Sequence, residues 1–317
     1  MATVRIGISG WRYPPWRGVF YPKGLPQRNE LAYASRIFPS IEINGSFYSL
    51  QTPSSYGAWH DATPTHFQFS VKAPRYITHI KRLRDVDTAL ANFFASGILR
   101  LGEKLGPILW QFPPSFRYNP ELMEGFFARL PHTTGDALVL AKKHDDHLPA
   151  GPWLEAVRSR PLRHAIEIRN ETFETPDFIL QLRRHGVAVV VADTANRWPL
   201  IEDVTADFIY MRLHGDEELY SSGYTEAALD RWATKIEAWS SGFQAAGVNT
   251  LIDPAPKRKT GRDVFVYFDN DVKVRAPYDA MSLSHRLGLG PAPLNVPAAK
   301  TIREVPRTSW PLYGRKS

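Results

Sequence analysis

Ser40-Ile41-Glu42-Ile43-Asn44-Gly45-Ser46-Phe47-Tyr48 places a carboxylate between two β-branched residues, with a second polar side chain two positions later. The stretch Ala165-Ile166-Glu167-Ile168-Arg169 repeats this arrangement. Side chains two apart on a strand point to the same face, and a carboxylate within an apolar strand is costly unless it is paired or hydrogen-bonded. The two stretches therefore predict two buried strands whose polar groups share one site.

Eight short β-branched or aromatic runs lie along the chain, and helical patterns or helix-length gaps separate most of them. They are residues 4–9, 40–44, 67–72, 107–112, 164–169, 188–193, 208–214 and 263–270. Strands that alternate with helices favour a parallel α/β sheet, and eight such units favour a closed (β/α)₈ TIM barrel. An open doubly wound sheet is the main alternative, but the turn after the first run, Gly7-Ile8-Ser9-Gly10-Trp11, lacks the expected Gly-rich phosphate fingerprint.

The helical segments and the domain limits follow from the same patterns. Apolar spacing and helix-start prolines predict helices over 26–38, 54–60, 87–101, 119–130, part of 153–158 and 276–287. Residues 1–287 then form a single barrel domain. Residues 288–317 contain five prolines and five Lys or Arg residues with few periodic apolar positions, which predicts an extended or disordered basic tail.

Composition excludes several classes of protein. The 317-residue chain has no cysteine, which rules out disulfides, thiolate metal sites and a cysteine nucleophile. It has no apolar run of about 20 residues, so no transmembrane helix is expected, and its first residues do not resemble a signal peptide. We expect a cytoplasmic protein with no membrane partner. Its net charge of +7 favours anionic partners, and the sequence leaves its oligomeric state open.

Polar or charged side chains lie at the carboxyl ends of all eight predicted strands, which is where TIM barrels carry their functional groups. These residues are Ser9, Glu42, Asn44, Lys72, Gln111, Glu167, Arg169, Asp193, Arg212, His214, Asp269 and Asn270. Carboxylates, a histidine and cations together suit general acid–base chemistry on a bound anion.

Three interpretations of this set remain open. In the first, Lys72, Arg169 and Arg212 bind an anionic group while a carboxylate or a histidine transfers protons, one carboxyl pKa being raised by burial and by neighbouring like charges. The proton-transfer candidates are Glu42, Glu167, Asp193 and His214. In the second, these same four residues bind a divalent metal, although no metal-binding motif supports this and nearby cations would repel the ion. In the third, the charges form only structural ion pairs.

Two histidines and two basic runs extend the candidate set. Lys72 and Arg75 are expected to lower the pKa of His79 and keep it neutral. His214 shares a strand face with Arg212 and precedes Gly215, which favours it over His79 as the acid or base. The basic runs 72–84 and 257–262 are candidates for nucleic-acid phosphate contacts, but no binding motif accompanies them, so solvated charged faces are favoured.

The chain resembles the YecE-like family, a group of uncharacterised proteins with a TIM-barrel fold. The matching stretches are Ile6-Gly7-Ile8-Ser9-Gly10-Trp11, Ile41-Glu42-Ile43-Asn44 with Phe47-Tyr48, Phe69-Ser70-Val71-Lys72 with Thr78-His79, Leu105-Gly106-Pro107-Ile108-Leu109-Trp110-Gln111-Phe112-Pro113, Ala165-Ile166-Glu167-Ile168-Arg169 and Tyr210-Met211-Arg212-Leu213-His214-Gly215. The resemblance covers residues 4–286 and implies the barrel, but it implies no activity. Two departures are Phe268-Asp269-Asn270-Asp271, where the family tends to have an aromatic residue followed by two asparagines, and the tail after Gly288, which resembles an addition.

These observations predict an enzyme, with hydrolase or isomerase chemistry favoured, that acts by general acid–base catalysis on a small phosphorylated or carboxylated substrate. Asn44 and Gln111 would orient this substrate, and the aromatic connection 11–21 would cover the site. The predicted substrate-binding set is completed by Trp11, Tyr48, His79 and Asn270. The alternatives are a metal-dependent phosphoesterase or isomerase and a non-catalytic nucleic-acid-binding protein. No cofactor is predicted, and a divalent metal remains open.

Overall fold

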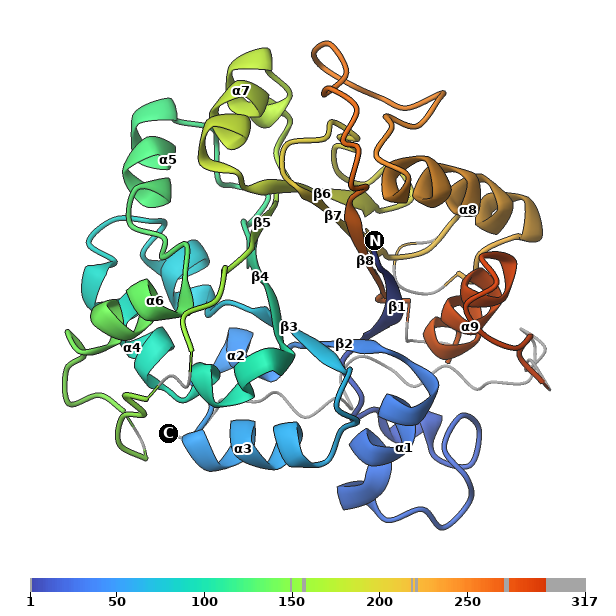
Figure 1. Cartoon of the computed structure of the whole chain (residues 1–317), viewed down its shortest axis with the longest axis horizontal. Coiled ribbons are helices and arrows are strands. Elements are labelled where there is room, and N and C mark those ends of the chain that lie inside the picture. Colours follow the sequence, from blue (N-terminus) through green and yellow to red (C-terminus); the bar gives the residue numbers. More distant parts are fainter. Residues whose placement is uncertain are drawn as a thin grey trace.

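Eight parallel strands close into a barrel in the order in which they occur along the chain. The computed structural model describes residues 2–148, 150–155, 158–217, 219, 222–270 and 274–294. Figure 1 shows the strands around the centre and the helices outside them. The strands are β1 (Val4–Ser9), β2 (Ser40–Ile43), β3 (Gln68–Lys72), β4 (Leu105–Gln111), β5 (His164–Glu167), β6 (Ala188–Asp193), β7 (Phe208–Leu213) and β8 (Asp263–Phe268). The predicted TIM barrel is confirmed, and each strand end lies within two residues of its predicted position.

Alternate residues of each strand point into the barrel, and the register aligns the polar ones. Ser9 is level with Glu42 on the neighbouring strand, and Gln111 is level with Glu167. A Cβ atom on Gly7 would lie 1.8 Å from the carbonyl oxygen of Ser40, so only glycine allows β1 and β2 to approach this closely. The sequence periodicity of two therefore becomes a polar layer at the carboxyl end of the barrel.

The sequence patterns did not predict the helices over 45–48, 134–141, 176–185 and 226–240, and two of the predicted helices need correction. Helices surround the barrel in the described part of the chain. They are α1 (Glu30–Ile37), α2 (Gly45–Tyr48), α3 (Pro53–Asp61), α4 (Asp87–Ala95), α5 (Pro120–Phe127), α6 (Thr134–Ala141), α7 (Pro176–His185), α8 (Glu226–Ser240) and α9 (Ala276–Arg286). The predicted helix 87–101 ends early because Gly97 adopts a left-handed conformation, with φ of 109°. The prediction of helix within 153–158 is wrong for residues 153–155 and 158, which are irregular.

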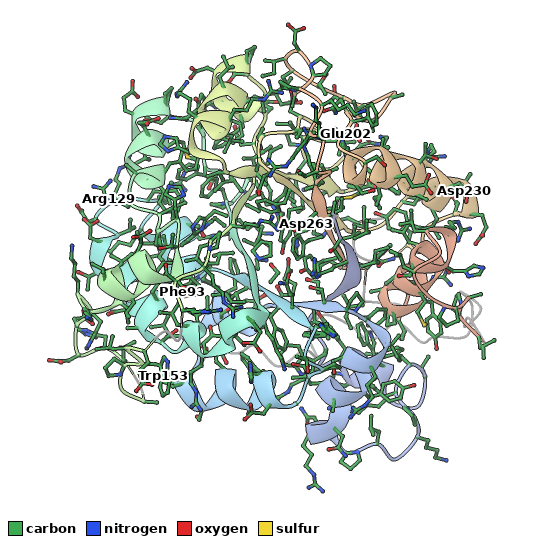
Figure 2. All side chains as sticks on the ribbon, viewed as in Figure 1. Phe93, Arg129, Trp153, Glu202, Asp230 and Asp263 are labelled. Carbon is green, nitrogen blue, oxygen red and sulfur yellow. The ribbon has the colours of Figure 1, made fainter. Side chains whose placement is uncertain are left out.

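The apolar core has two parts. The large outer part lies between strands and helices, and Figure 2 shows side chains filling the molecule inward from the peripheral Arg129, Trp153 and Asp230. The smaller part fills the barrel interior and consists of Leu109, Ala165, Ala188, Val190, Ala192, Phe208, Tyr210, Phe265 and Tyr267. This interior plug closes the barrel below its polar layer and supports that layer from beneath.

The aromatic connection that follows β1 packs against the outer wall of the barrel. Trp16 and Phe20 are buried, and Phe20 stacks on Phe38 just after α1. Trp11 packs edge-on against Trp59 of α3. These contacts favour the structural role for residues 11–21 over the predicted cover for the site.

Residues 288–294 of the predicted tail are irregular and border an apolar groove on this wall, and residues 295–317 lie outside the described part of the chain. Within the described residues, no helix is long and apolar enough to cross a membrane. The cytoplasmic location stays a prediction.

Candidate functional site

Arg212 lies at the centre of the polar layer and binds three carboxylates from different strands. Its guanidinium contacts both carboxylate oxygens of Glu42, at 3.1 Å from Nε and 2.9 Å from Nη2. Its Nη1 lies 2.8 Å from Oε2 of Glu167, and its Nη2 lies 2.8 Å from Oδ2 of Asp269. With Ser9, Tyr210 and His214, these residues form what we call the Arg212 cluster.

Further hydrogen bonds satisfy the remaining atoms of the Arg212 cluster. Ser9 donates its hydroxyl proton to Glu42 and accepts from Arg212 Nη2 at 3.1 Å. Tyr210 donates to Oε2 of Glu42 at 2.6 Å. Nδ1 of His214 lies 3.1 Å from Asp269 Oδ2, and its Nε2 lies 3.4 Å from Arg212 Nη1. Every nitrogen of the Arg212 guanidinium therefore faces a partner within the protein.

The charges of this cluster hold one another in their ionised states. Burial alone would raise the pKa of Glu167, but Arg169 and Arg212 hold it well below its ordinary value. Burial alone would lower the pKa of Arg212, but Glu42 and Asp269 hold it well above its ordinary value. The expectation that burial and like charges raise the pKa of one candidate carboxyl group does not hold for Glu167, because arginines surround it. It holds for Asp193, whose pKa is raised mainly by burial.

A second group of side chains lies nearer to solvent around the mouth of the barrel. We call Lys72, Phe47, His79, Arg169 and Trp198 the mouth residues. Nζ of Lys72 lies 4.3 Å from the ring centroid of Phe47, and the guanidinium of Arg169 lies 3.8 Å from the ring centroid of Trp198. The Arg169 side chain is 13% exposed, whereas that of Arg212 is 1% exposed. A molecule from solvent therefore meets Arg169 before Arg212.

Lys72 differs from the two arginines in its partners. Among the described residues, no carboxylate forms an ion pair or a hydrogen bond with its Nζ, whereas Arg169 lies 2.8 Å from Oε1 of Glu167. Burial, together with Arg212, lowers the pKa of Lys72 to about 8. A buried amine with this pKa exchanges protons readily near neutral pH.

His79 occupies a distorted turn that follows β3. Residues Tyr76–Ile80 form one π-helical turn, a conformation frequent at functional sites, and Arg82, Leu83 and Asp85 just beyond it adopt positive φ angles. The His79 ring packs edge-on against Phe47, with ring centroids 5.1 Å apart. Burial, then Lys72, lowers the pKa of His79 to about 4, so the predicted neutral imidazole is confirmed.

As the acid or base, the structure favours His79 over His214, whereas the sequence favoured His214. His214 is fully buried behind Arg212 and Asp269, and burial and Arg212 lower its pKa. His79 is partly exposed and lies beside Lys72. The strand face that His214 shares with Arg212 points into a closed cluster. The position that favoured His214 in the sequence therefore buries its side chain.

Asn44 and Gln111 join the site as predicted. Asn44 donates to Ser9 Oγ at 2.8 Å and is partly exposed at the end of β2. Gln111 donates to Oε1 of Glu167 at 2.8 Å. Tyr48, on α2, is 55% exposed and packs edge-on against Phe47, which places it on the rim.

Three predicted site residues lie outside this assembly. Asp193 is level with the outward-facing Leu213 and accepts hydrogen bonds from Tyr224 and Trp232 at 3.1 and 3.3 Å. Asn270 donates to Asp279 Oδ2 at 2.7 Å between β8 and α9. Trp11 packs between β3 and α3, against Phe69 and Trp59. In the structure, each of these side chains makes contacts within the wall of the barrel.

Tyr210 and Trp198 lie in the site although no sequence pattern predicted this. Tyr210 lies two residues before Arg212 on β7, so strand periodicity could have placed it in the same layer. Trp198 comes from the irregular connection between β6 and β7, and no sequence signal places its ring on Arg169.

The two alternative interpretations meet physical obstacles. Within the described residues, no group of three or more potential ligands is arranged to hold a metal ion, and the carboxylate oxygens of the Arg212 cluster accept hydrogen bonds from its guanidinium. The basic run 72–84 follows β3, whereas 257–262 precedes β8, so the two runs lie at opposite ends of the barrel. Arg262 of the second run is buried and bonds backbone carbonyls.

Fold and site together define a (β/α)₈-barrel protein with a charged, partly solvent-exposed cluster at the carboxyl ends of its strands. Residues 5–303 match the family described as "Protein of unknown function DUF72". The chain therefore belongs to this family. The match continues beyond Gly288, so the interpretation of the whole tail as an addition is wrong for residues 288–303.

Relatives and solved structures agree with this assignment. The UPF0759 protein YunF of Bacillus subtilis is 32% identical over 123 residues, which are 37% of this chain and 43% of the relative. The UPF0759 protein YecE of Escherichia coli K12 is 28% identical over 113 residues, 36% of this chain and 39% of the relative. The alignments thus span less than half the length of these curated relatives.

Crystal structures of two DUF72 family proteins share the fold. The protein from Thermotoga maritima MSB8 has a TM-score of 0.68 at 24% identity, covering 90% of this chain and 99% of that one. The protein from Enterococcus faecalis V583 has a TM-score of 0.62 at 15% identity, covering 92% of this chain and 100% of that one.

Proposed function

We propose that this protein is an enzyme that binds a small carboxylated or phosphorylated molecule at the barrel mouth and acts on it by proton transfer. The observation that carries the proposal is the contrast in pairing between the buried cations. The donors of Arg212 face acceptors within the protein, whereas Lys72 has no described carboxylate partner. An anion bound beside Lys72 would supply the negatively charged partner that its ammonium lacks among the described residues.

The mouth residues have different roles in the proposed reaction. Arg169 is held by Glu167 on one side and by the Trp198 ring on the other, which fixes a planar donor group that suits carboxylate or phosphate oxygens. Lys72 and neutral His79 both lie against Phe47 and are the proton-transfer groups. Asn44, which is partly exposed, would orient the substrate. Acid–base catalysis is thus assigned to Lys72 and His79 and no longer to the residues favoured from the sequence, Glu42, Glu167 and His214.

Thermal unfolding with added anions tests this proposal. Phosphate, sulfate and small phosphosugars are added to the wild type and to Arg169→Ala. A ligand at about 100 times its Kd adds roughly 2.7 kcal/mol of stability, which raises Tm by roughly 5 °C in a chain of this size. We expect this shift with at least one anion in the wild type and its loss in Arg169→Ala.

Arg163→Ala is the matched control. Arg163 precedes β5 as Arg169 follows it, pairs with Asp263 at 2.6 Å and lies 5.2 Å from the ring centroid of Phe208. Its removal breaks the same kinds of contact at the opposite end of the barrel and should leave the anion shift intact. A wild type that no anion stabilises, or a shift that Arg163→Ala removes equally, would contradict the proposal.

A further inference from the structure

Lys72 combines burial, an aromatic neighbour and access to solvent in a way that Lys104, Lys235 and Lys257 do not. Lys104 is also buried, but its ammonium donates to the carbonyl oxygens of His60 and Thr63 at 2.6 and 2.8 Å. Lys235 lies 2.6 Å from Oε1 of Glu202. Lys257 lies 4.1 Å from the Phe243 ring centroid, but it is exposed at the other end of the barrel. Only for Lys72, among these four, is a buried amine left without a described hydrogen bond or ion pair and placed beside the mouth.

Its surroundings disfavour the protonated form of the amine. Lys72 is 8% exposed, so its charge is poorly solvated. Arg212 and, to a smaller extent, Arg169 add positive charge nearby, whereas Glu167 and Glu42 act in the opposite direction. Desolvation and a neighbouring cation are the two means by which proteins turn a lysine into a nucleophile. The pKa of about 8 leaves roughly a tenth of Lys72 as free amine at pH 7.

We propose that Lys72 forms an imine with a small carbonyl compound whose carboxylate or phosphate group is bound by Arg169. This inference rests on the proposed function and narrows its substrate class to anionic aldehydes and ketones. Arg169 and Lys72 approach the mouth from different strands, β5 and β3. The substrate would have to reach both side chains, with its anionic group at Arg169 and its carbonyl carbon at Lys72.

The covalent step needs no partner beyond the substrate and acid–base groups. The lone pair of Nζ attacks the carbonyl carbon, and the carbon–oxygen π pair moves to oxygen, which takes a proton and gives a carbinolamine. A proton leaves nitrogen, the oxygen receives a second proton and departs as water, and a carbon–nitrogen double bond forms. Neutral His79, which packs against the same Phe47 ring as Lys72, is the group we assign to accept the proton from nitrogen and to return one to oxygen.

Reductive trapping with glyoxylate tests the inference. Glyoxylate is the smallest carboxylate that carries an aldehyde, and borohydride reduces its imine to a stable carboxymethyl amine that peptide mass mapping locates. The lowered pKa gives Lys72 about 300 times more free amine at pH 7 than an ordinary lysine, and its weaker basicity reduces the expected rate advantage to about twentyfold. We expect Lys72 to be labelled about twentyfold faster than Lys257, with a pH midpoint near 8.

Two controls separate reactivity from anion recognition. Formaldehyde is a neutral aldehyde, so Arg169→Ala should slow the labelling of Lys72 by glyoxylate more than its labelling by formaldehyde, which loses only the effect of Arg169 on the pKa of Lys72. Lys72→Arg keeps the charge and removes the nucleophile, so it should lose the fast label while Lys257 is labelled as before. Labelling of Lys72 no faster than that of Lys257, with either aldehyde, would overturn the inference.

Glycolate separates failure of this inference from failure of the proposed function. It carries the carboxylate of glyoxylate without the carbonyl. A rise in Tm with glycolate, together with slow labelling of Lys72, would retain the anion site and reject the imine. The absence of both effects would reject the imine and count against the anion site as well.

Discussion

Arg212 and Lys72 are both buried cations at the carboxyl end of one barrel, yet the protein treats them in opposite ways. Arg212 binds Glu42, Glu167 and Asp269, and these carboxylates raise its pKa. Lys72 rests on an aromatic ring, and its surroundings lower its pKa. The first arrangement satisfies a charge and fixes the fold around it. The second leaves a charge unsatisfied at a point that solvent reaches.

The difference in pairing distinguishes polar residues that stabilise the fold from those that can take part in catalysis. A paired buried charge is strongly destabilising only when one partner is removed. A buried charge without a partner costs stability while it is present, as functional groups often do. Substitutions at the two places should therefore change stability with opposite signs.

Glu167→Ala should give the largest effect. It leaves Arg212, Arg169 and Gln111 without their shared acceptor, so we expect a loss of about 3–5 kcal/mol in the free energy of unfolding, measured by urea denaturation. The control is Glu124→Ala, which breaks a half-exposed contact with His185 and should cost at most about 1 kcal/mol. Equal stability of Glu167→Ala and the wild type would show that the Arg212 cluster does not hold the fold.

Lys72→Met should stabilise the protein at pH 7, by roughly 3 kcal/mol at most. The pKa of Lys72 is lower in the folded state, about 8, than its ordinary value of 10.5, so protonation opposes folding. The cost is fully present below pH 8, decreases as the pH rises and disappears above 10.5. Urea denaturation of both proteins across this range measures it.

Lys257→Met provides the comparison for this prediction. Lys257 also lies against an aromatic ring but is exposed, and its loss should change stability by less than about 0.5 kcal/mol at every pH. If Lys72→Met destabilised the protein at pH 7, Lys72 would have to be held by a favourable contact, and the contrast with Arg212 would fail.

Asp269→Asn should give the smallest effect, because Asp269 is 15% exposed and Arg212 retains two other carboxylates. We expect a loss of about 1 kcal/mol at pH 7. Arg212 and His214 hold the pKa of Asp269 below its ordinary value despite burial, so its stabilising contribution is present above about pH 4 and is lost as the pH falls. The stability difference between the two proteins should therefore be smaller at pH 3 than at pH 7; a difference that grows on acidification would contradict this assignment.

The sequence predicted the fold well because strand and helix signals are local. The β-branched runs place all eight strands to within two residues. The helix that begins at Asp87 extended too far in the prediction because Leu101 continues its apolar spacing, although Gly97 ends it with a backbone conformation that spacing does not reveal.

The site was harder to predict because its contacts join distant parts of the chain. Strand periodicity placed Glu42 with Asn44 and Glu167 with Arg169, yet it could not show that Arg212 binds both glutamates. Asp193 ends a strand that is apolar on both faces, so its sequence does not reveal that the side chain points outward. The role of Lys72 depends on which carboxylates the arginines occupy, and that follows only from the assembled barrel.

The Arg212 cluster also bears on how such a protein can change over evolutionary time. Its ties join β1, β2, β5 and β7 and the residue after β8, so an exchange at one of these positions leaves partners on several strands unmatched. Tyr48, His79 and Trp198 belong to connections outside these strands, so substitutions there leave the contacts of the Arg212 cluster in place. Single substitutions can thus change which molecules the barrel mouth binds, while the Arg212 cluster is inherited unchanged.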